Sequence, residues 1–227
     1  MPENLTASLS PSAFDAQLWA NRHEPPVLAQ CDDFLRAQND SFDWLWRRAR
    51  LEHFLFMQNE NTKEKSNLHI EAAHRWAQSA LKTDEKRVES VFWAATCELE
   101  WAQTRGKIWA ARALGHCEKQ LDAACGHDES FHHGGPLRVL GRVIARKPLI
   151  LGGNLERALT FYEASLRFAP HNSTTLLYKA DALIRDNQPG RAKKTLRFLL
   201  EKSDGSDWQW ETLRDRDLAA KWLQNRF

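Results

Sequence analysis

Apolar residues recur along most of the chain with the three-to-four-residue spacing of amphipathic helices. The pattern is most complete in the C-terminal half, where two helical hairpins follow each other and the second repeats the first. Ala158 and Tyr162 of the first hairpin lie 34 residues before Ala192 and Leu196 of the second. A period of 34 residues, with small residues where paired helices touch, is typical of tetratricopeptide repeats. The pattern therefore predicts a helical-repeat scaffold.

The N-terminal half shows similar apolar stripes with less regular connections between them. After an N-terminal tail and the break at Pro25 and Pro26, the stripes become longer and more strongly amphipathic. We expect short helices over residues 13–21 and 27–38, followed by longer ones over 41–58, 68–83, 88–104 and 107–125.

The last helix, expected from Glu211 to about Asn225, is apolar on one side and charged on the other. A helix of this kind closes the exposed end of a solenoid. The whole pattern predicts an all-α fold, a tetratricopeptide-like right-handed array of about ten helices. We divide it into a tail with short helices (1–40), the repeats (41–203) and a capping helix (204–227).

The helix expected over residues 88–104 is apolar on two faces. Trp93, Cys97 and Trp101, spaced by four residues, form a second stripe beside the main packing stripe. Such a helix is either buried centrally between neighbours or lines a groove. If it lines a groove, Trp93 and Trp101 are the best candidates for aromatic anchors of a partner.

Four further residues are candidates for partner binding. Arg138 and Tyr178 each offer a polar tip from an otherwise packed helix. His132 and His133 precede Pro136, where a helix can begin, and could hold a partner carboxylate near the helix N-terminus. The alternative is that the two histidines belong to a turn that caps the helix.

Composition and the N-terminal sequence indicate which classes of partner and which cellular compartment to expect. A net charge of +2 creates no long-range field for nucleic acid, so none is expected as a partner. No window approaches 18 apolar residues, which predicts no membrane span. The N-terminus lacks the basic and apolar regions of a signal peptide, and the four cysteines have irregular spacing. We therefore expect a soluble cytoplasmic protein without a disulfide framework.

Catalytic and metal-binding motifs are scarce in the sequence. P-loop, G-x-S-x-G and H-E-x-x-H motifs are absent. The segment 125–133 holds Cys125, His127, His132 and His133, the elements of a zinc site without a recognised ligand spacing. A metal-dependent enzyme using this segment is thus the alternative to the expectation of no enzymatic activity, no metal and no cofactor. Arg142 and Arg146 are interpreted as part of a solvated helix face.

Several segments carry a resemblance to a known family: FDWLWRRARLEHF, VFWAATCELEWA, FHHGGPLRVLGRV and LGGNLERALTFYEASLRFAP. They resemble the T component family of tripartite ATP-independent periplasmic (TRAP) transporters over about two-thirds of the chain. The matching positions are Gly134, Gly135, Pro136, Leu140, Gly141, Gly152, Gly153, Ala158 and Pro170.

The resemblance implies an all-helical tetratricopeptide-like protein. Family members are exported lipoproteins that are thought to associate with a solute-binding protein, and some have a pore for a small apolar ligand. The scaffold itself predicts a binding function, with a protein segment or a small apolar ligand held on the concave face. An accessory subunit of a TRAP-type solute transport system is the alternative that the resemblance supplies.

Overall fold

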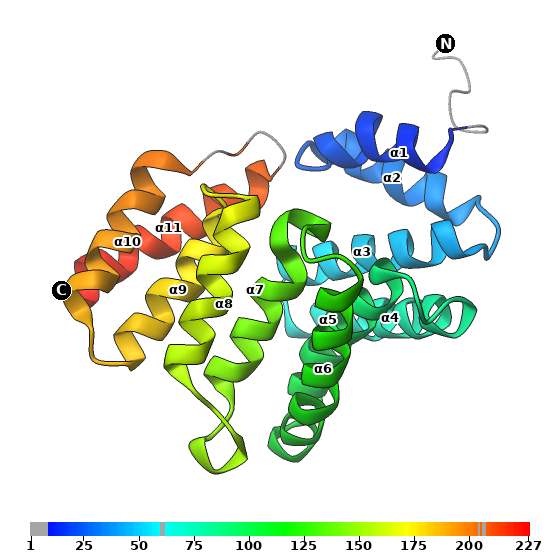
Figure 1. Ribbon diagram of the computed structural model, residues 1–227. Helices are drawn as coiled ribbons and strands as arrows, with labels where there is room; N and C mark the ends of the chain where they lie inside the picture. Colours follow the sequence, from blue (N-terminus) through cyan, green and yellow to red (C-terminus); the bar gives the residue numbers. More distant parts are fainter. Residues whose placement is uncertain (1–8, 60–61, 204, 206–207) are drawn as a thin grey trace. The chain divides into compact units, whose positions relative to one another are not determined.

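The computed structural model describes residues 9–59, 62–203, 205 and 208–227. Within these residues the chain forms eleven α-helices and two 3-10 turns, with no strand (Figure 1). Most consecutive helices contact one another, which confirms the predicted all-α helical-repeat fold. None of the described helices is both long and apolar enough to cross a membrane.

Contacts within the chain divide it into two compact units, Met1–Ala110 (unit 1) and Ala111–Phe227 (unit 2). In unit 1, α3 packs on α2, α4 and α5, and α4 packs on α5. The described elements of unit 1 are α1 (Pro11–Gln17), η1 (Trp19–Asn21), α2 (Pro25–Arg36), α3 (Phe42–Gln58), α4 (Lys63–Thr83), α5 (Val88–Arg105) and the start of α6 (Lys107–His127). The division at 40 and 204 stays a prediction.

Two boundaries in unit 1 differ from those expected. The helix expected over residues 13–21 is two elements, because α1 begins at Pro11 under a side-chain cap from Ser10 and ends before η1. Helix α4 begins at Lys63, before the expected start at Leu68. Its polar first turn is mostly exposed, so it carries no apolar stripe that the sequence pattern could reveal.

Unit 1 attaches its N-terminal helix through buried arginines on α3. Arg47 and Arg50 both bind the carboxylate of Asp15 on α1, and Arg47 does so at 2.5 Å. The same guanidinium groups stack on indole rings, at 4.0 Å for Arg50 over Trp19 and for Arg47 over Trp46. Burial lowers the pKa of Arg50 to about 10, against the opposing effect of Asp15. Ion pairs and cation–π contacts therefore hold α1 and η1 on α3.

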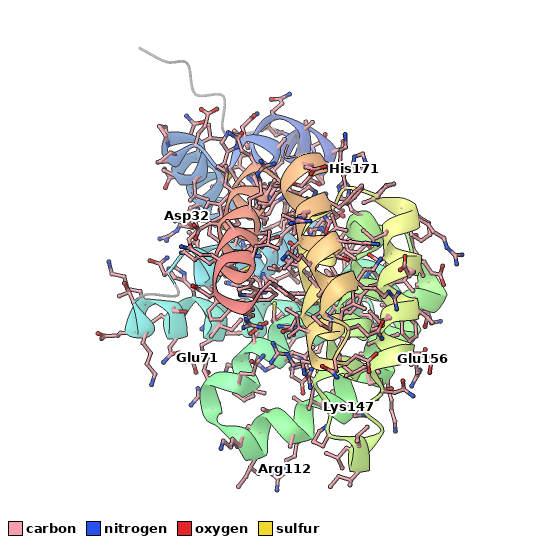
Figure 2. The ribbon with its side chains drawn as sticks, turned by 90° about the vertical axis from the view of Figure 1, so that its left-hand side faces the viewer. Asp32, Glu71, Arg112, Lys147, Glu156 and His171 are labelled. Carbon is pink, nitrogen blue, oxygen red and sulfur yellow. The ribbon has the colours of Figure 1, made fainter. Side chains whose placement is uncertain are left out.

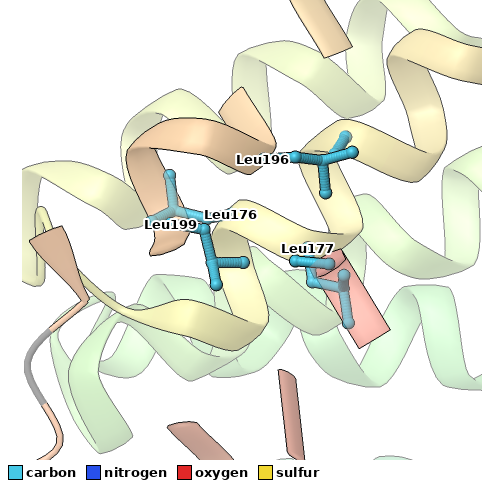
Figure 3. Packing of buried hydrophobic residues seen from close by; sticks show 6 residues of the cluster. Leu176, Leu177, Leu196 and Leu199 are labelled. Atoms are coloured by element: carbon cyan, nitrogen blue, oxygen red, sulfur yellow. The ribbon is translucent and has the colours of Figure 1, made fainter. Parts of the chain in front are cut away.

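Unit 2 contains the two helical hairpins that show the 34-residue period. Helix α7 packs on α8, α8 on α9, and α9 and α10 pack on each other and on α11. Figure 3 shows the aliphatic core between α9, α10 and α11, to which Leu176, Leu177, Leu196 and Leu199 contribute. The elements are the rest of α6, α7 (Phe131–Arg146), η2 (Leu149–Leu151), α8 (Leu155–Phe168), α9 (Ser173–Arg185), α10 (Pro189–Lys202) and α11 (Gln209–Arg226).

The residues that define the 34-residue period occupy equivalent buried positions. Ala158 and Tyr162 on α8, and Ala192 and Leu196 on α10, are all fully buried. Gly141 lets α7 approach α8 closely, because a Cβ atom there would lie 2.9 Å from Cε1 of Tyr162. Small residues thus set the distance between paired helices, as the repeat pattern predicts.

Candidate binding site on unit 2

A left-handed turn precedes the regular part of α7. His132, His133 and Gly134 have φ values of 53°, 59° and 72°, in the region that residues with a side chain rarely adopt. The right-handed helix follows, with Gly135 and Pro136 in its first turn. The two histidines therefore lie in a turn ahead of the helix, which is the alternative that the sequence analysis left open.

Arg138 holds this turn from the first part of the helix. Its Nη1 donates to the carbonyl of His133 at 3.2 Å, and its Nη2 to that of His132 at 3.5 Å. The hydroxyl of Ser165 on α8 donates to the carbonyl of Gly134 at 3.0 Å. The indole of Trp208 lies against both imidazoles, with ring centroids 4.5 and 5.2 Å away. Contacts from three elements thus maintain the unfavourable backbone conformation.

The guanidinium of Arg138 is buried without a carboxylate in direct contact. Only 5% of the residue is exposed, and in the described part of the chain no Asp or Glu lies within ion-pair distance of it. Burial lowers the pKa of Arg138, while Tyr178 and Asp215 oppose that effect through space. Peptide carbonyls therefore serve as its partners.

Arg142 and Arg146 continue the row of Arg138 along α7 at four-residue spacing. Arg142 stacks over the ring of Tyr178 on α9 at 4.4 Å and donates to Asp181 at 2.6 Å. Arg146 lies 3.4 Å from the same carboxylate. Arg185, also on α9, donates to the carbonyl of Ala145. We call the surface formed by Arg142, Arg146, Tyr178, Asp181 and Arg185 the arginine face.

The arginine face has more positive than negative charge. The face has three guanidinium groups and one carboxylate, that of Asp181, which pairs with Arg142 and Arg146. The side chain of Asp181 is only 12% exposed, whereas that of Arg146 is 51% exposed. Burial and the neighbouring Arg142 lower the pKa of Arg146, against the effect of Asp181. Arginine binds carboxylates through two parallel N–H groups, so the face suits an acidic partner.

A buried hydroxyl lies behind the arginine face. Tyr162 is fully buried, and its Oη has no hydrogen-bond partner among the described residues. Burial raises the pKa of Tyr162, and the positive charge of Arg142 is the largest effect that opposes this shift. A buried hydroxyl of this kind is usually satisfied by an ordered water molecule.

A family comparison agrees with this architecture. The family model described as TRAP transporter T-component matches residues 23–201. The chain belongs to the TRAP transporter T-component family. The match includes most of unit 1 and unit 2 as far as the end of α10. In a comparison with curated proteins, none matched the sequence.

This T-component chain brings four of the six predicted binding residues together. Arg138, Tyr178, His132 and His133 all lie in or beside the α7–α9 region of unit 2. The sequence analysis missed Arg142, which is packed against Tyr178 and Asp181 and is not part of a solvated face. The spacing of three arginines at four-residue intervals was the signal that could have indicated it.

The two predicted tryptophans belong to unit 1. Trp93 is 3% exposed, and its ring contacts those of His53 and Phe92 at 5.6 and 5.1 Å. It lies in the core, as the alternative of a central buried helix expects, and its part in partner binding stays a prediction. Trp101 is half-buried and stacks on His74 at 4.5 Å, with the more exposed Trp109 against its edge.

Unit 1 also contains an open cavity of about 410 Å³ beside Trp76. Its three guanidinium groups, from Arg36, Arg48 and Arg75, are balanced by three carboxylates, from Asp32, Asp40 and Glu52. Most of these charges already pair within the chain, as Arg36 does with Asp32 and Arg48 with Asp40. The cavity therefore has no excess charge of the kind that the arginine face offers.

The segment 125–133 does not assemble ligands around one point. Among the residues that the structure describes, no group of three or more His, Cys, Asp or Glu side chains could hold a metal ion. Burial raises the pKa of the Cys125 thiol to about 12, with Glu129 acting in the same direction. The described geometry therefore gives no support to the alternative of a metal-dependent enzyme.

Proposed function

We propose that this protein is a non-enzymatic accessory subunit of a TRAP-type solute transport system, and that it binds a protein subunit of that system. The observation that carries the proposal is the T-component match over residues 23–201. A helical-repeat scaffold is suited to this role because its stacked helices present an extended surface to a protein partner.

The arginine face is the surface that we assign to the partner. Arginine and tyrosine dominate the energetics of many protein interfaces, and here Arg142 and Tyr178 are pre-organised by stacking on each other. Arg146 and Arg185 lie at the more exposed side of the face, where a partner could reach them. An acidic patch on the partner would complement the excess positive charge.

The charge of the arginine face also distinguishes between a small apolar ligand and a protein segment as its partner. A small apolar ligand would leave the guanidinium groups of Arg142 and Arg146 without a new partner while removing water from them. An acidic protein segment would replace that water with charge-assisted hydrogen bonds. The arginine face therefore favours a protein partner, and the solute-binding subunit of the transporter is our candidate.

The test is direct association of the purified protein with the TRAP solute-binding subunit of the same organism. Size-exclusion chromatography with light scattering should show a complex, and raising the salt concentration should weaken it because charged groups are screened. A solute-binding protein from an unrelated transporter class is the control. Separate elution of the two proteins at every concentration would contradict the proposal.

A further inference from the structure

The open cavity of unit 1 has the size and the mixed lining of a site for a small organic molecule. Its volume is about 410 Å³, which is within the range of small-molecule sites. Leu35 on α2 and Leu51 on α3 are buried, and they line the cavity together with the half-buried ring of Trp76 on α4. We call these three side chains the apolar lining. It can accept the apolar part of a ligand.

A buried arginine of the cavity is held in one conformation by the protein itself. Arg48 donates from Nε to the carbonyl of Leu35 at 3.1 Å and from Nη2 to that of Gln38 at 2.6 Å, and it pairs with Asp40. Its guanidinium also stacks over the ring of Trp76 at 4.8 Å. A lining that is ordered before binding loses little conformational entropy when a ligand enters.

A second arginine of the cavity, Arg75 on α4, has no carboxylate within ion-pair distance among the described residues. Its guanidinium stacks over the ring of Trp76 at 5.4 Å. Glu71, one turn earlier on α4, pairs with Arg105 at 2.9 Å instead (Figure 2 labels Glu71). Arginine binds a carboxylate through two parallel N–H groups. Arg75 is therefore available for the carboxylate of a ligand.

Two carboxylates supply negative charge to the same cavity. Asp32 on α2, labelled in Figure 2, pairs with Arg36 at 2.8 Å, and the side chain of Arg36 is 76% exposed. Exposed ion pairs of this kind contribute little to stability, so a ligand can exchange with Arg36 at low cost. Glu52 on α3 contacts Nδ1 of His69 at 2.7 Å through one carboxylate oxygen. Both carboxylates have further lone pairs for the N–H groups of a ligand ammonium.

We propose that this cavity binds an α-amino acid with an apolar side chain, in its zwitterionic form. The carboxylate of the ligand pairs with Arg75, its ammonium pairs with Asp32 or Glu52, and its side chain contacts the apolar lining. The cavity has three guanidinium groups and three carboxylates, so a zwitterion keeps the charge balanced, whereas a ligand with a net charge does not. This site is separate from the arginine face, which belongs to unit 2 and has an excess of positive charge.

The test is calorimetric titration of the whole protein with L-leucine and two of its analogues. Leucinamide lacks the carboxylate, and N-acetyl-leucine lacks the ammonium. We expect L-leucine to bind and each analogue to bind about tenfold more weakly, because each analogue loses charge-assisted hydrogen bonds. The proposal is overturned if L-leucine does not bind at millimolar concentration, or if either analogue binds as tightly as L-leucine does.

The variant Arg75→Gln tests which residue takes the carboxylate. It should weaken the binding of L-leucine about tenfold and leave that of leucinamide unchanged, because leucinamide has no carboxylate for Arg75 to bind. Lys82→Gln is the matched control, since Lys82 is an exposed cation of α4 that lies outside the cavity. It should leave binding unchanged, and thermal melting should show that both variants are folded. The proposal is also overturned if Arg75→Gln binds L-leucine as the wild type does, or if it loses equal affinity for leucinamide.

Discussion

The two units bury arginine in different ways. In unit 1, Arg47 and Arg50 share the carboxylate of Asp15 and stack on tryptophan rings. In unit 2, Arg138 has peptide carbonyls as its partners, and these belong to the left-handed turn before α7. Both arrangements satisfy a buried cation, but one uses a charged partner from another helix and the other uses neutral partners nearby in the chain.

The difference indicates separate roles for the two groups of arginines. The carboxylate of Asp15 ties α1 to α3, so the buried cations of unit 1 stabilise the attachment of an N-terminal helix. Arg138 instead fixes the start of α7, the helix that presents Arg142 and Arg146 to the surface. We therefore expect loss of stability from changes in unit 1, and loss of partner binding from changes on the arginine face.

Asp15→Ala should have the largest effect on stability. It leaves the guanidinium groups of Arg47 and Arg50 buried without their shared carboxylate, and breaking a buried ion pair costs about 3 kcal/mol or more. Urea denaturation measures the change in the free energy of unfolding. Asp43→Ala is the matched control, since the half-exposed Asp43 lies 3.8 Å from Arg47 and its loss should cost less than about 1 kcal/mol. Equal losses from the two variants would contradict the account of unit 1.

Ala158→Leu should disturb the paired helices of unit 2. Ala158 is fully buried on α8 where α7 approaches closely, so a larger side chain overpacks the contact and costs about 1–3 kcal/mol. Thermal melting compares it with Ala220→Leu, a change at an exposed position of α11 that should have little effect. A wild-type melting temperature for Ala158→Leu would show that the repeat register is wrong.

Arg138→Met tests how much the hydrogen bonds from Arg138 to peptide carbonyls contribute to stability. The variant leaves the carbonyls of His132 and His133 without their donor, while it removes the cost of burying a charge. We expect a net loss of about 1 kcal/mol, smaller than that of Asp15→Ala because no charge is left unpaired. Chemical denaturation measures the free energy of unfolding of Arg138→Met and of Asp15→Ala. A larger loss of stability from Arg138→Met than from Asp15→Ala would contradict this expectation.

His74 should give a small dependence of stability on pH. Burial lowers its pKa below the ordinary value of 6.5, against the opposing effect of Glu71. Well above pH 6.5 the imidazole is neutral in both the folded and the unfolded protein, so it has no effect on the free energy of unfolding. As the pH falls through 6.5 the imidazole of the unfolded state takes up a proton before that of the folded state does, so stability decreases.

The variant His74→Phe should lose the part of the stability decrease at low pH that is due to His74. His171→Phe is the control, because His171 is exposed on unit 2. The measurement is the melting temperature of each variant against pH. An unchanged acid sensitivity in His74→Phe would show that other groups account for it.

The sequence predicted the fold better than the site, for a physical reason. The burial of Ala158, Tyr162, Ala192 and Leu196 follows from local periodicity, which a sequence displays directly. The left-handed turn at His132 and His133 depends on contacts from Arg138, Ser165 and Trp208, which come from different elements.

The surface features were harder to predict because they depend on what each side chain meets. Arg142 could belong to a solvated face or to a packed one until Tyr178 and Asp181 are placed beside it. Trp93 could line a groove or fill a core until its neighbours His53 and Phe92 are known. Helical periodicity identifies the face on which a residue lies, whereas tertiary contacts decide whether that face is open.

We propose that the arginine face of unit 2 binds a protein subunit of a TRAP-type transporter. The most direct test is to measure, by calorimetry, how tightly the solute-binding subunit binds the wild type and two double variants. The two double variants carry the same net charge. Arg146→Gln/Arg185→Gln removes two exposed cations from the face, and Arg36→Gln/Arg105→Gln removes two from unit 1. We expect the first variant to weaken binding about tenfold or more and the second to leave it unchanged. Equal Kd values for the two variants would contradict it.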